Sequence, residues 1–214
     1  MNRKEKTKKI YSILKKTYPD AHCELNFKNP VELLIATILS AQCTDVKVNE
    51  VTKTLFQEYK KPEDYLAKPV SHLESIIRPT GFFRNKAKNI QNAMKALVDL
   101  HKGKVPKTME ELTALPGVGR KTANVVLGNA YDLPGLPVDT HVMRVTNRLG
   151  ITGEEDPVKI EYELHEVLPD KDWCQFSHTI IFHGRRLCKA KKPACETCPV
   201  LEFCDYGEKR EHAE

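Results

Sequence analysis

The sequence predicts an all-α protein. Its 214 residues contain no convincing β-hairpin and no run of alternating β-branched residues. Amphipathic segments with helix-capping residues recur along the whole chain instead. Repeats and low-complexity tracts are absent. We therefore expect roughly ten helices joined by short loops.

The individual segments explain this expectation. In residues 29–40, Asn29 suits an N-cap and Pro30 the first helical position. The segment is apolar nearly all round, which indicates a central buried helix. Residues 44–59 follow, with Thr44 or Asp45 as the cap. Four further helices are expected at 85–101, with Ala87, Ile90, Met94, Leu97 and Val98 on one face, at 141–150, ending at Gly150, and at 157–168 and 173–188.

Composition limits the class of protein. Lys and Arg number 34 against 29 Asp and Glu, an excess of five that permits a polyanionic partner without requiring one. No apolar run approaches the roughly 20 residues of a membrane span. The N-terminus is basic but lacks the apolar core of a signal peptide, so it predicts a charged first helix. We expect a cytoplasmic protein without a membrane partner.

Residues 116–122, PGVGRKT, look at first like a phosphate-binding P-loop. That motif needs a glycine at position 114, but this chain has Ala114 there. It also needs a lysine directly after the last glycine, but Arg120 follows Gly119. It also follows a strand, whereas residues 108–115 favour a helix. We conclude that the stretch joins two helices through a tight glycine turn.

Two helices joined in this way form a helix–hairpin–helix. Gly117 and Gly119 permit positive φ and a close approach of the backbone to a ligand. The second helix then points free N–H groups and its positive dipole end at that ligand, which suits a DNA phosphate. A purely structural turn is the alternative.

Two side chains near this turn suit catalysis. Lys121 lies in the first turn of the second helix, where the dipole disfavours an ammonium, and partial burial in a cleft would lower its pKa further. Both effects favour a neutral nucleophile. Asp139 precedes the next helix and suits an N-cap, but the same carboxylate could accept the amine's proton or stabilise positive charge on a sugar.

Four of the seven cysteines crowd near the C-terminus. Cys188, Cys195, Cys198 and Cys204 have the spacing C-x6-C-x2-C-x5-C, which allows one four-thiolate site. Zinc sites with four cysteines usually have two short knuckles, and this segment has one. Spacing thus favours an iron–sulfur cluster and leaves zinc open. The remaining cysteines, Cys23, Cys43 and Cys174, are expected to pack as ordinary thiols.

The first cysteine gap is basic. Residues 185–192, RRLCKAKK, hold five cations. This is either a solvated charge run or a loop, tied at Cys188 and Cys195, that presents Lys189, Lys191 and Lys192 to DNA phosphates.

Taken together, these motifs resemble a known family. Residues 24–45 (ELNFKNPVELLIATILSAQCTD), 115–126 (LPGVGRKTANVV) and 138–145 (VDTHVMRV), followed by the four-cysteine pattern, closely resemble bacterial and archaeal endonuclease III. This family consists of bifunctional DNA glycosylases/AP lyases of the helix–hairpin–helix superfamily. The resemblance covers about residues 20–206.

The resemblance implies two helical lobes. A six-helix lobe, residues 22–133, would hold the hairpin, and residues 1–21 plus 134–214 would hold a [4Fe–4S] cluster on the four cysteines. The Pro/Gly loop 131–139 is the expected boundary. The family also implies a monomer, associated with the nucleoid, that binds double-stranded DNA with a damaged base or an abasic site.

The resemblance further implies the chemistry. An oxidised pyrimidine leaves the stack, Lys121 attacks C1′ to form a Schiff base, Asp139 assists, and β-elimination cuts 3′ to the abasic site. Gln42 matches the residue that fills the gap left by the flipped base, and Asp45 is a candidate contact to the opposite strand. The family often has Leu where this chain has Phe82, whose ring could wedge by stacking instead.

Related activities remain alternatives at this point. An adenine-mismatch or thymine/uracil-mismatch glycosylase shares parts of the pattern but usually lacks the lysine at position 121. Two alternatives belong to other classes of protein: a non-catalytic DNA-binding module and a zinc-stabilised helical adaptor. The presence of both Lys121 and Asp139 argues against them, because neither needs these two residues.

Overall fold

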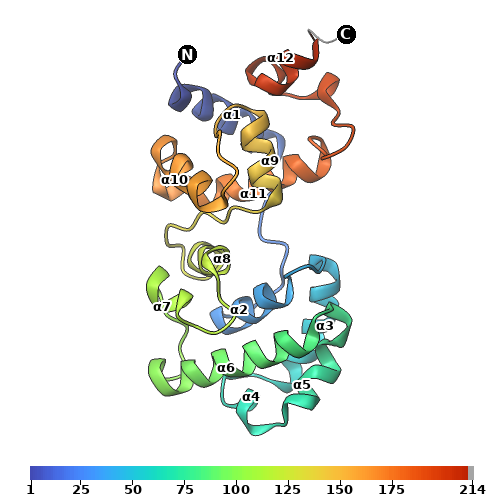
Figure 1. Cartoon of the computed structure of the whole chain (residues 1–214), viewed down its shortest axis with the longest axis vertical. Helices are drawn as coiled ribbons and strands as arrows, with labels where there is room; N and C mark the ends of the chain where they lie inside the picture. Colours follow the sequence, from blue (N-terminus) through green and yellow to red (C-terminus); the bar gives the residue numbers. More distant parts are fainter. Residues whose placement is uncertain (212–214) are drawn as a thin grey trace. The chain divides into compact units, whose positions relative to one another are not determined.

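The computed structural model describes residues 1–211, and helices are the regular secondary structure found in that range (Figure 1). The all-α prediction is thereby confirmed. Two compact units make up the chain. Unit 1 contains Met1–His22 and Pro134–Glu214, of which 212–214 lie outside the described residues, and unit 2 contains Cys23–Leu133. Each unit has its own hydrophobic core.

Unit 2 contains seven α-helices and one 3-10 turn among its described residues. This is one helix more than the six implied by the resemblance, and α4 is a single turn. The elements are α2 (Pro30–Leu39), α3 (Asp45–Glu58), α4 (Asp64–Ala67), α5 (Val70–Ile77), η1 (Arg78–Thr80), α6 (Phe83–His101), α7 (Met109–Thr113) and α8 (Arg120–Ala130).

Helix α2 is the centre of unit 2. The Asn29 side chain accepts a hydrogen bond from the backbone N–H of Glu32, and Pro30 begins the helix, as expected. Every residue from Leu33 to Leu39 is buried. Helices α3, α6 and α8 pack around it (Figure 1). An element apolar on all sides is stable only in such a surrounded position.

Its neighbours are amphipathic. Thr44 caps α3 by accepting from the N–H of Lys47, so Asp45 is the first helical residue. Helix α6 turns Ala87, Ile90, Met94 and Leu97 into the core and leaves its other side to solvent. This burial of one face explains why the longest helix of unit 2 is stable on its surface.

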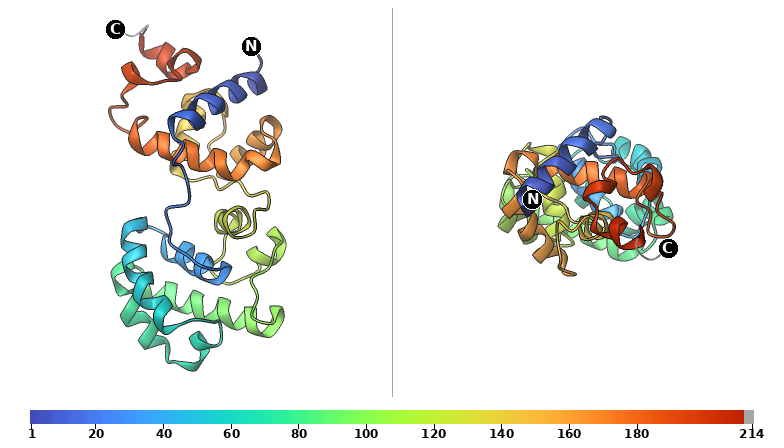
Figure 2. Two further views of the ribbon diagram at one scale, coloured as in Figure 1. Left: turned by 180° about the vertical axis from the view of Figure 1, so that it is seen from behind. Right: turned by 90° about the horizontal axis from the view of Figure 1, so that it is seen from above.

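Unit 1 combines the N-terminal helix with the C-terminal part of the chain. Its elements are α1 (Arg3–Thr17), α9 (Thr140–Arg148), α10 (Pro157–Val167), η2 (Asp170–Asp172), α11 (Trp173–Arg186), η3 (Cys195–Thr197), η4 (Leu201–Phe203) and α12 (Asp205–Glu211). The predicted charged first helix is present, and Ile10 and Leu14 are its fully buried apolar residues. Figure 2 shows α1 beside α11, against which α9 also packs.

None of the described helices has the length and apolar character that crossing a membrane requires.

Candidate functional site

The helix–hairpin–helix is formed by α7 and α8. Thr108 caps α7, and the N–H of Val118 donates to the carbonyl of Leu115 inside the turn. Gly117 has a φ of +75°, and a Cβ added there would lie 2.7 Å from the Cβ of Asn89 on α6. Both the dihedral and the close approach require glycine at position 117.

Gly119 differs from the expectation. Its φ is −92° with ψ 173°, an extended conformation, so the predicted use of positive φ holds for Gly117 and is wrong for Gly119. Gly119 is instead the N-cap of α8, without a capping side chain, and a Cβ there would meet nothing within 4 Å. The start of α8 therefore lacks a capping side chain and has open space beside Gly119, which suits an anion.

Lys121 follows in the first turn of α8. Ala123, Val126 and Leu127 anchor this helix in the core of unit 2, whereas Lys121 is exposed within its unit. The partial burial considered from the sequence is therefore not provided by unit 2 itself. The lysine is accessible to a ligand that approaches the start of α8.

Asp139 is the N-cap of α9 in unit 1. Its Oδ1 accepts hydrogen bonds from the N–H groups of His141, at 2.9 Å, and Val142, at 2.8 Å. The carboxylate is half-buried, and these two bonds fix its orientation. The capping role anticipated from the sequence is present, and a chemical role is compatible with it because both bonds use one oxygen.

Two short turns of unit 2 carry further candidates. Gln42 lies between α2 and α3, and Phe82 between η1 and α6. Both are exposed, Phe82 by 66%, and both have left-handed backbones, with φ of 54° and 48°. Neither Gln nor Phe favours this region, so nothing in the sequence predicts these conformations. Asp45 is half-buried at the start of α3.

The four cysteines follow α11 in the order of the chain. Cys188 comes after the C-cap Leu187, Cys195 begins η3, Cys198 follows it, and Cys204 follows η4. All four are free thiols and partly buried. Burial raises the pKa of Cys198 to about 11, and the charges of Cys204, Cys188 and Cys195 raise it as well. The four thiols are thus within electrostatic reach of one another.

The donor set fits an iron–sulfur cluster, because such clusters are held by four cysteine thiolates. Four thiolates can also bind zinc, so the donor chemistry by itself fits both groups. Burial raises the pKa of the Cys198 and Cys204 thiols, and bound iron would nevertheless hold these sulfurs as thiolates.

Two arginines of α9 hold the first cysteine gap. Arg148 donates from Nη1 to the Lys189 carbonyl at 2.8 Å and from Nη2 to the Ala190 carbonyl at 2.9 Å, and its Nη1 lies 3.5 Å from the Sγ of Cys188. Arg144 donates to the Cys188 carbonyl at 3.1 Å. The sequence does not single out these arginines, because their partners lie about 40 residues away in the chain.

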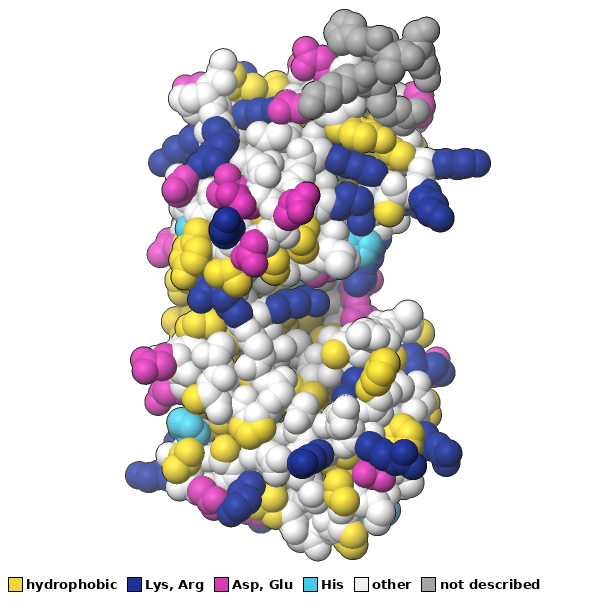
Figure 3. All heavy atoms as spheres, viewed as in Figure 1, with side chains coloured by type: hydrophobic (Ala, Val, Ile, Leu, Met, Phe, Trp, Pro, Cys, Tyr) yellow, Lys and Arg dark blue, Asp and Glu magenta, His cyan; other side chains and the backbone are white. Residues whose placement is uncertain are grey.

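The gap itself presents its lysines to solvent. Lys189, Lys191 and Lys192 are all exposed. On the face shown in Figure 3, basic side chains are spread over both units with acidic ones among them. The charge on this face therefore does not mark a DNA-binding surface. The first cysteine gap stands out instead because Arg148 binds the carbonyls of Lys189 and Ala190.

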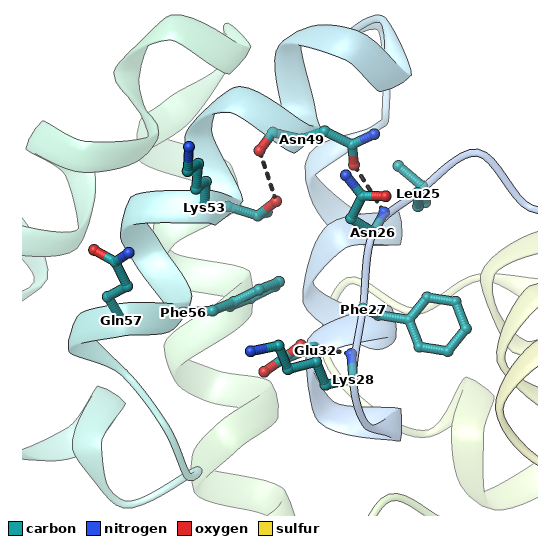
Figure 4. A pocket seen from close by; sticks show the side chains of 10 residues that line it. Leu25, Asn26, Phe27, Lys28, Glu32, Asn49, Lys53, Phe56 and Gln57 are labelled. Atoms are coloured by element: carbon teal, nitrogen blue, oxygen red, sulfur yellow. Dashed lines mark hydrogen bonds between the residues drawn. The ribbon is translucent and has the colours of Figure 1, made fainter.

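A separate pocket of about 470 Å³ opens in unit 2 between residues 25–28 and helices α2 and α3 (Figure 4). The Asn26 N–H donates to Asn49 at 2.8 Å, and the Lys28 N–H donates to Glu32 at 2.7 Å. None of the candidate residues lines this pocket.

Comparison with known proteins defines the class. Residues 35–170 match the model of the HhH-GPD superfamily of base excision DNA repair proteins. Residues 188–204, which begin and end on cysteines of the cluster segment, match the iron–sulfur binding domain of endonuclease III. The fold and the hairpin thus belong to a base excision repair protein of the HhH-GPD superfamily.

Individual relatives narrow this class. Endonuclease III of Bacillus subtilis is 52% identical over 195 residues, 91% of this chain and 89% of that protein. Endonuclease III of Synechocystis is 50% identical over 204 residues, 95% and 93% of the two chains. A non-covalent endonuclease III–DNA complex matches with a TM-score of 0.93 and 47% identity over 99% of this chain and 100% of that one. A trapped covalent endonuclease III–DNA intermediate matches with a TM-score of 0.93 and 48% identity over the same shares.

The chain therefore belongs to the endonuclease III family of DNA glycosylases/AP lyases, and it carries a [4Fe–4S] cluster. The zinc adaptor and the non-catalytic module are excluded by this membership. The monofunctional alternatives are also wrong, because the family is bifunctional.

Proposed function

We propose that this enzyme removes oxidised pyrimidines from duplex DNA and that Lys121 is its nucleophile. The observation that carries this proposal is the exposed lysine in the first turn of α8, two residues after the N-cap Gly119, which has no capping side chain and open space beside it. The amide groups there would hold a DNA phosphate beside the amine. The trapped covalent complex of a relative supports a covalent route.

The proposed reaction has two stages. The damaged base leaves the stack, and the neutral amine of Lys121 attacks C1′ while the bond from C1′ to the base breaks. Asp139 accepts the proton lost by the amine and passes it to the departing base, or it stabilises positive charge on the sugar while water supplies that proton. The C1′–O4′ bond then breaks as the nitrogen forms a double bond to C1′ and O4′ takes up a proton, which leaves Lys121 and the sugar joined by a Schiff base. This Schiff base acidifies C2′. Loss of a C2′ proton then breaks the 3′ C–O bond, and water finally releases Lys121.

Other residues would bind the DNA. Gln42 fills the gap left by the base, Phe82 wedges the stack from its exposed turn, and Asp45 contacts the opposite strand. Gly117 and Gly119 bring backbone N–H groups to a phosphate. Lys189, Lys191 and Lys192 contact phosphates of the duplex.

Cys188, Cys195, Cys198 and Cys204 would hold the [4Fe–4S] cluster. We assign it a structural role: it ties the C-terminal segment and the basic gap, which has little core of its own, to α9 and α11. Excision and elimination transfer no electrons to a metal. Oxidising or reducing the intact cluster should leave single-turnover cleavage at saturating DNA unchanged, and a change in that rate would contradict this role.

We place the enzyme, as a monomer, in the cytoplasm at the nucleoid. Sedimentation of the purified protein with and without a short duplex would show one chain per DNA, and a dimer would contradict the assignment.

The decisive experiment is borohydride trapping. A duplex with one thymine glycol is incubated with wild type, Lys121→Ala or, as a matched control, Lys95→Ala, whose lysine is exposed on α6 and paired with Asp99 at 2.7 Å. We expect a covalent protein–DNA band for wild type and Lys95→Ala and none for Lys121→Ala. A band in Lys121→Ala would refute the nucleophile. No base release by wild type would refute the substrate.

A further inference from the structure

Lys86 is a buried lysine that the reaction described above does not use. Its side chain is 5% exposed, at the start of α6. Its Nζ donates one hydrogen bond to the carbonyl of Leu39 and another to the carbonyl of Thr80, both at 2.8 Å. Burial lowers the pKa of this ammonium from its usual value. The two carbonyls replace hydrogen bonds to water that the ammonium loses on burial.

The two acceptors are the ends of two helical elements. Leu39 is the last residue of α2, and Thr80 is the last residue of η1. Terminal carbonyls lack intrahelical partners and form the negative end of the dipole. The Lys86 ammonium on α6 donates a hydrogen bond to both of these carbonyls. It thereby joins α2 and η1, which have no backbone hydrogen bond to each other among those described.

Each of these carbonyls lies two or three residues before a residue with a left-handed backbone. Gln42, with φ 54°, comes three residues after Leu39, and Phe82, with φ 48°, comes two residues after Thr80. Left-handed backbone at residues other than glycine persists only where surrounding contacts hold it. Lys86 binds the helix end from which each of the two turns starts.

We propose that Lys86 is a positioning residue that holds the Gln42 turn and the Phe82 turn at a fixed separation, so that the two exposed side chains enter the duplex together. This inference rests on the proposed function, in which Gln42 fills the gap and Phe82 wedges the stack. Opening a duplex has a free-energy cost that falls when the base is already unpaired. When Gln42 and Phe82 are already ordered in the free protein, binding to DNA loses less conformational entropy, and more of the binding free energy is left to open the duplex.

The test uses the variant Lys86→Met, which keeps an unbranched side chain of similar length and removes the ammonium, and compares two substrates. One substrate has thymine glycol paired with adenine, and the other has the same lesion opposite an abasic-site analogue. We expect single-turnover base release from the paired lesion to fall about ten- to a hundredfold. Release from the unpaired lesion should change by less than about threefold, because little extrusion remains to be done. Equal losses on both substrates, or no loss on either, would overturn the proposal.

Two further variants separate positioning from simple destabilisation. Lys86→Gln keeps amide donors and should recover part of the rate on the paired lesion, and it also serves if Lys86→Met does not fold. The double variant Lys86→Met/Phe82→Ala should be little slower than Phe82→Ala, because the two changes affect one step. Fully additive losses would contradict a route through Phe82. Lys95→Met, on the outer face of the same helix, should behave as wild type.

Rates are normalised to the fraction of each protein that borohydride traps on a pre-formed abasic site. Wild type that is trapped but releases no thymine glycol would refute the proposed substrate. Active wild type with unchanged Lys86 variants would refute this inference alone.

Discussion

Asp139 and Asp156 cap consecutive helices of unit 1 with the same geometry. In each, Oδ1 accepts from the N–H groups two and three residues further on, at 2.9 and 2.8 Å for Asp139 and at 2.9 and 3.0 Å for Asp156. The two residues thus form a matched pair in which only Asp139 is assigned a chemical role.

This pair separates capping from catalysis. Asparagine caps helices about as well as aspartate, so Asp139→Asn and Asp156→Asn should each change the free energy of unfolding by less than about 0.5 kcal/mol. Asp139→Asn should slow single-turnover base release about 10²- to 10⁴-fold, and Asp156→Asn should not. Urea unfolding and gel-based kinetics measure the two effects. A comparable rate loss in Asp156→Asn would mean that capping explains the result.

The two glycines of the hairpin give a second matched pair. Gly117→Ser forces a side chain onto a φ of +75° and a Cβ toward Asn89, so it should destabilise the protein by about 1–3 kcal/mol. Gly119→Ser meets open space at an N-cap with extended backbone, so stability should be unchanged or slightly higher. The new hydroxyl would nevertheless occupy the phosphate site, and affinity for an abasic duplex should fall. Unchanged affinity in Gly119→Ser would argue against a phosphate at this helix start.

The basic gap is tested by salt dependence. If Lys189, Lys191 and Lys192 contact phosphates, the negative slope of log K against log salt should become shallower by about 0.9 for each lysine that is replaced by Gln. The triple variant with all three replacements should show the largest change. Fluorescence anisotropy on an undamaged duplex measures this slope. Lys159→Gln serves as the control, because Lys159 is exposed on α10 and pairs with Glu154 at 3.4 Å. The iron content of the triple variant must equal that of wild type, which shows that the cluster is intact. An unchanged slope in that variant would show that the three lysines are only solvated.

A buried histidine predicts a pH dependence of stability. Burial lowers the pKa of His178 from 6.5 to about 4, with the nearby His22 adding to this. The unfolded imidazole therefore binds a proton that the folded one refuses, so stability decreases as the pH falls from about 6.5 toward 4. Between pH 7 and pH 5, wild type should lose about 2 kcal/mol more than His178→Gln in urea unfolding. Parallel pH profiles for the two proteins would contradict this assignment.

Local signals in the sequence were sufficient for most of the fold. Asn29 and Pro30 begin α2, Gly150 follows the end of α9, and continuous apolar character placed α2 at the centre of its unit. These features depend on neighbouring residues, which is why they can be recognised without a structure. The spacing of the four cysteines likewise favours an iron–sulfur cluster over a zinc ion on the sequence alone.

Contacts between distant residues could not be predicted in this way. The sequence shows Lys86 as one of many lysines, and only packing reveals that it is buried and bonded to Leu39 and Thr80. The extended backbone of Gly119, the left-handed backbones of Gln42 and Phe82, and the Arg148 contacts to the first cysteine gap have the same origin.

By itself, then, the sequence determined most of the longer helices, caps such as Asn29 and Thr44, and the hairpin, because these depend on side-chain chemistry and on residues a few positions apart. It also predicts Lys121 and Asp139 as the reactive groups. The tertiary structure alone decided which turns are strained, which lysine is buried and which arginines hold the cysteine segment. The physical reason is that burial and long-range hydrogen bonds exist only once packing has brought separate segments together.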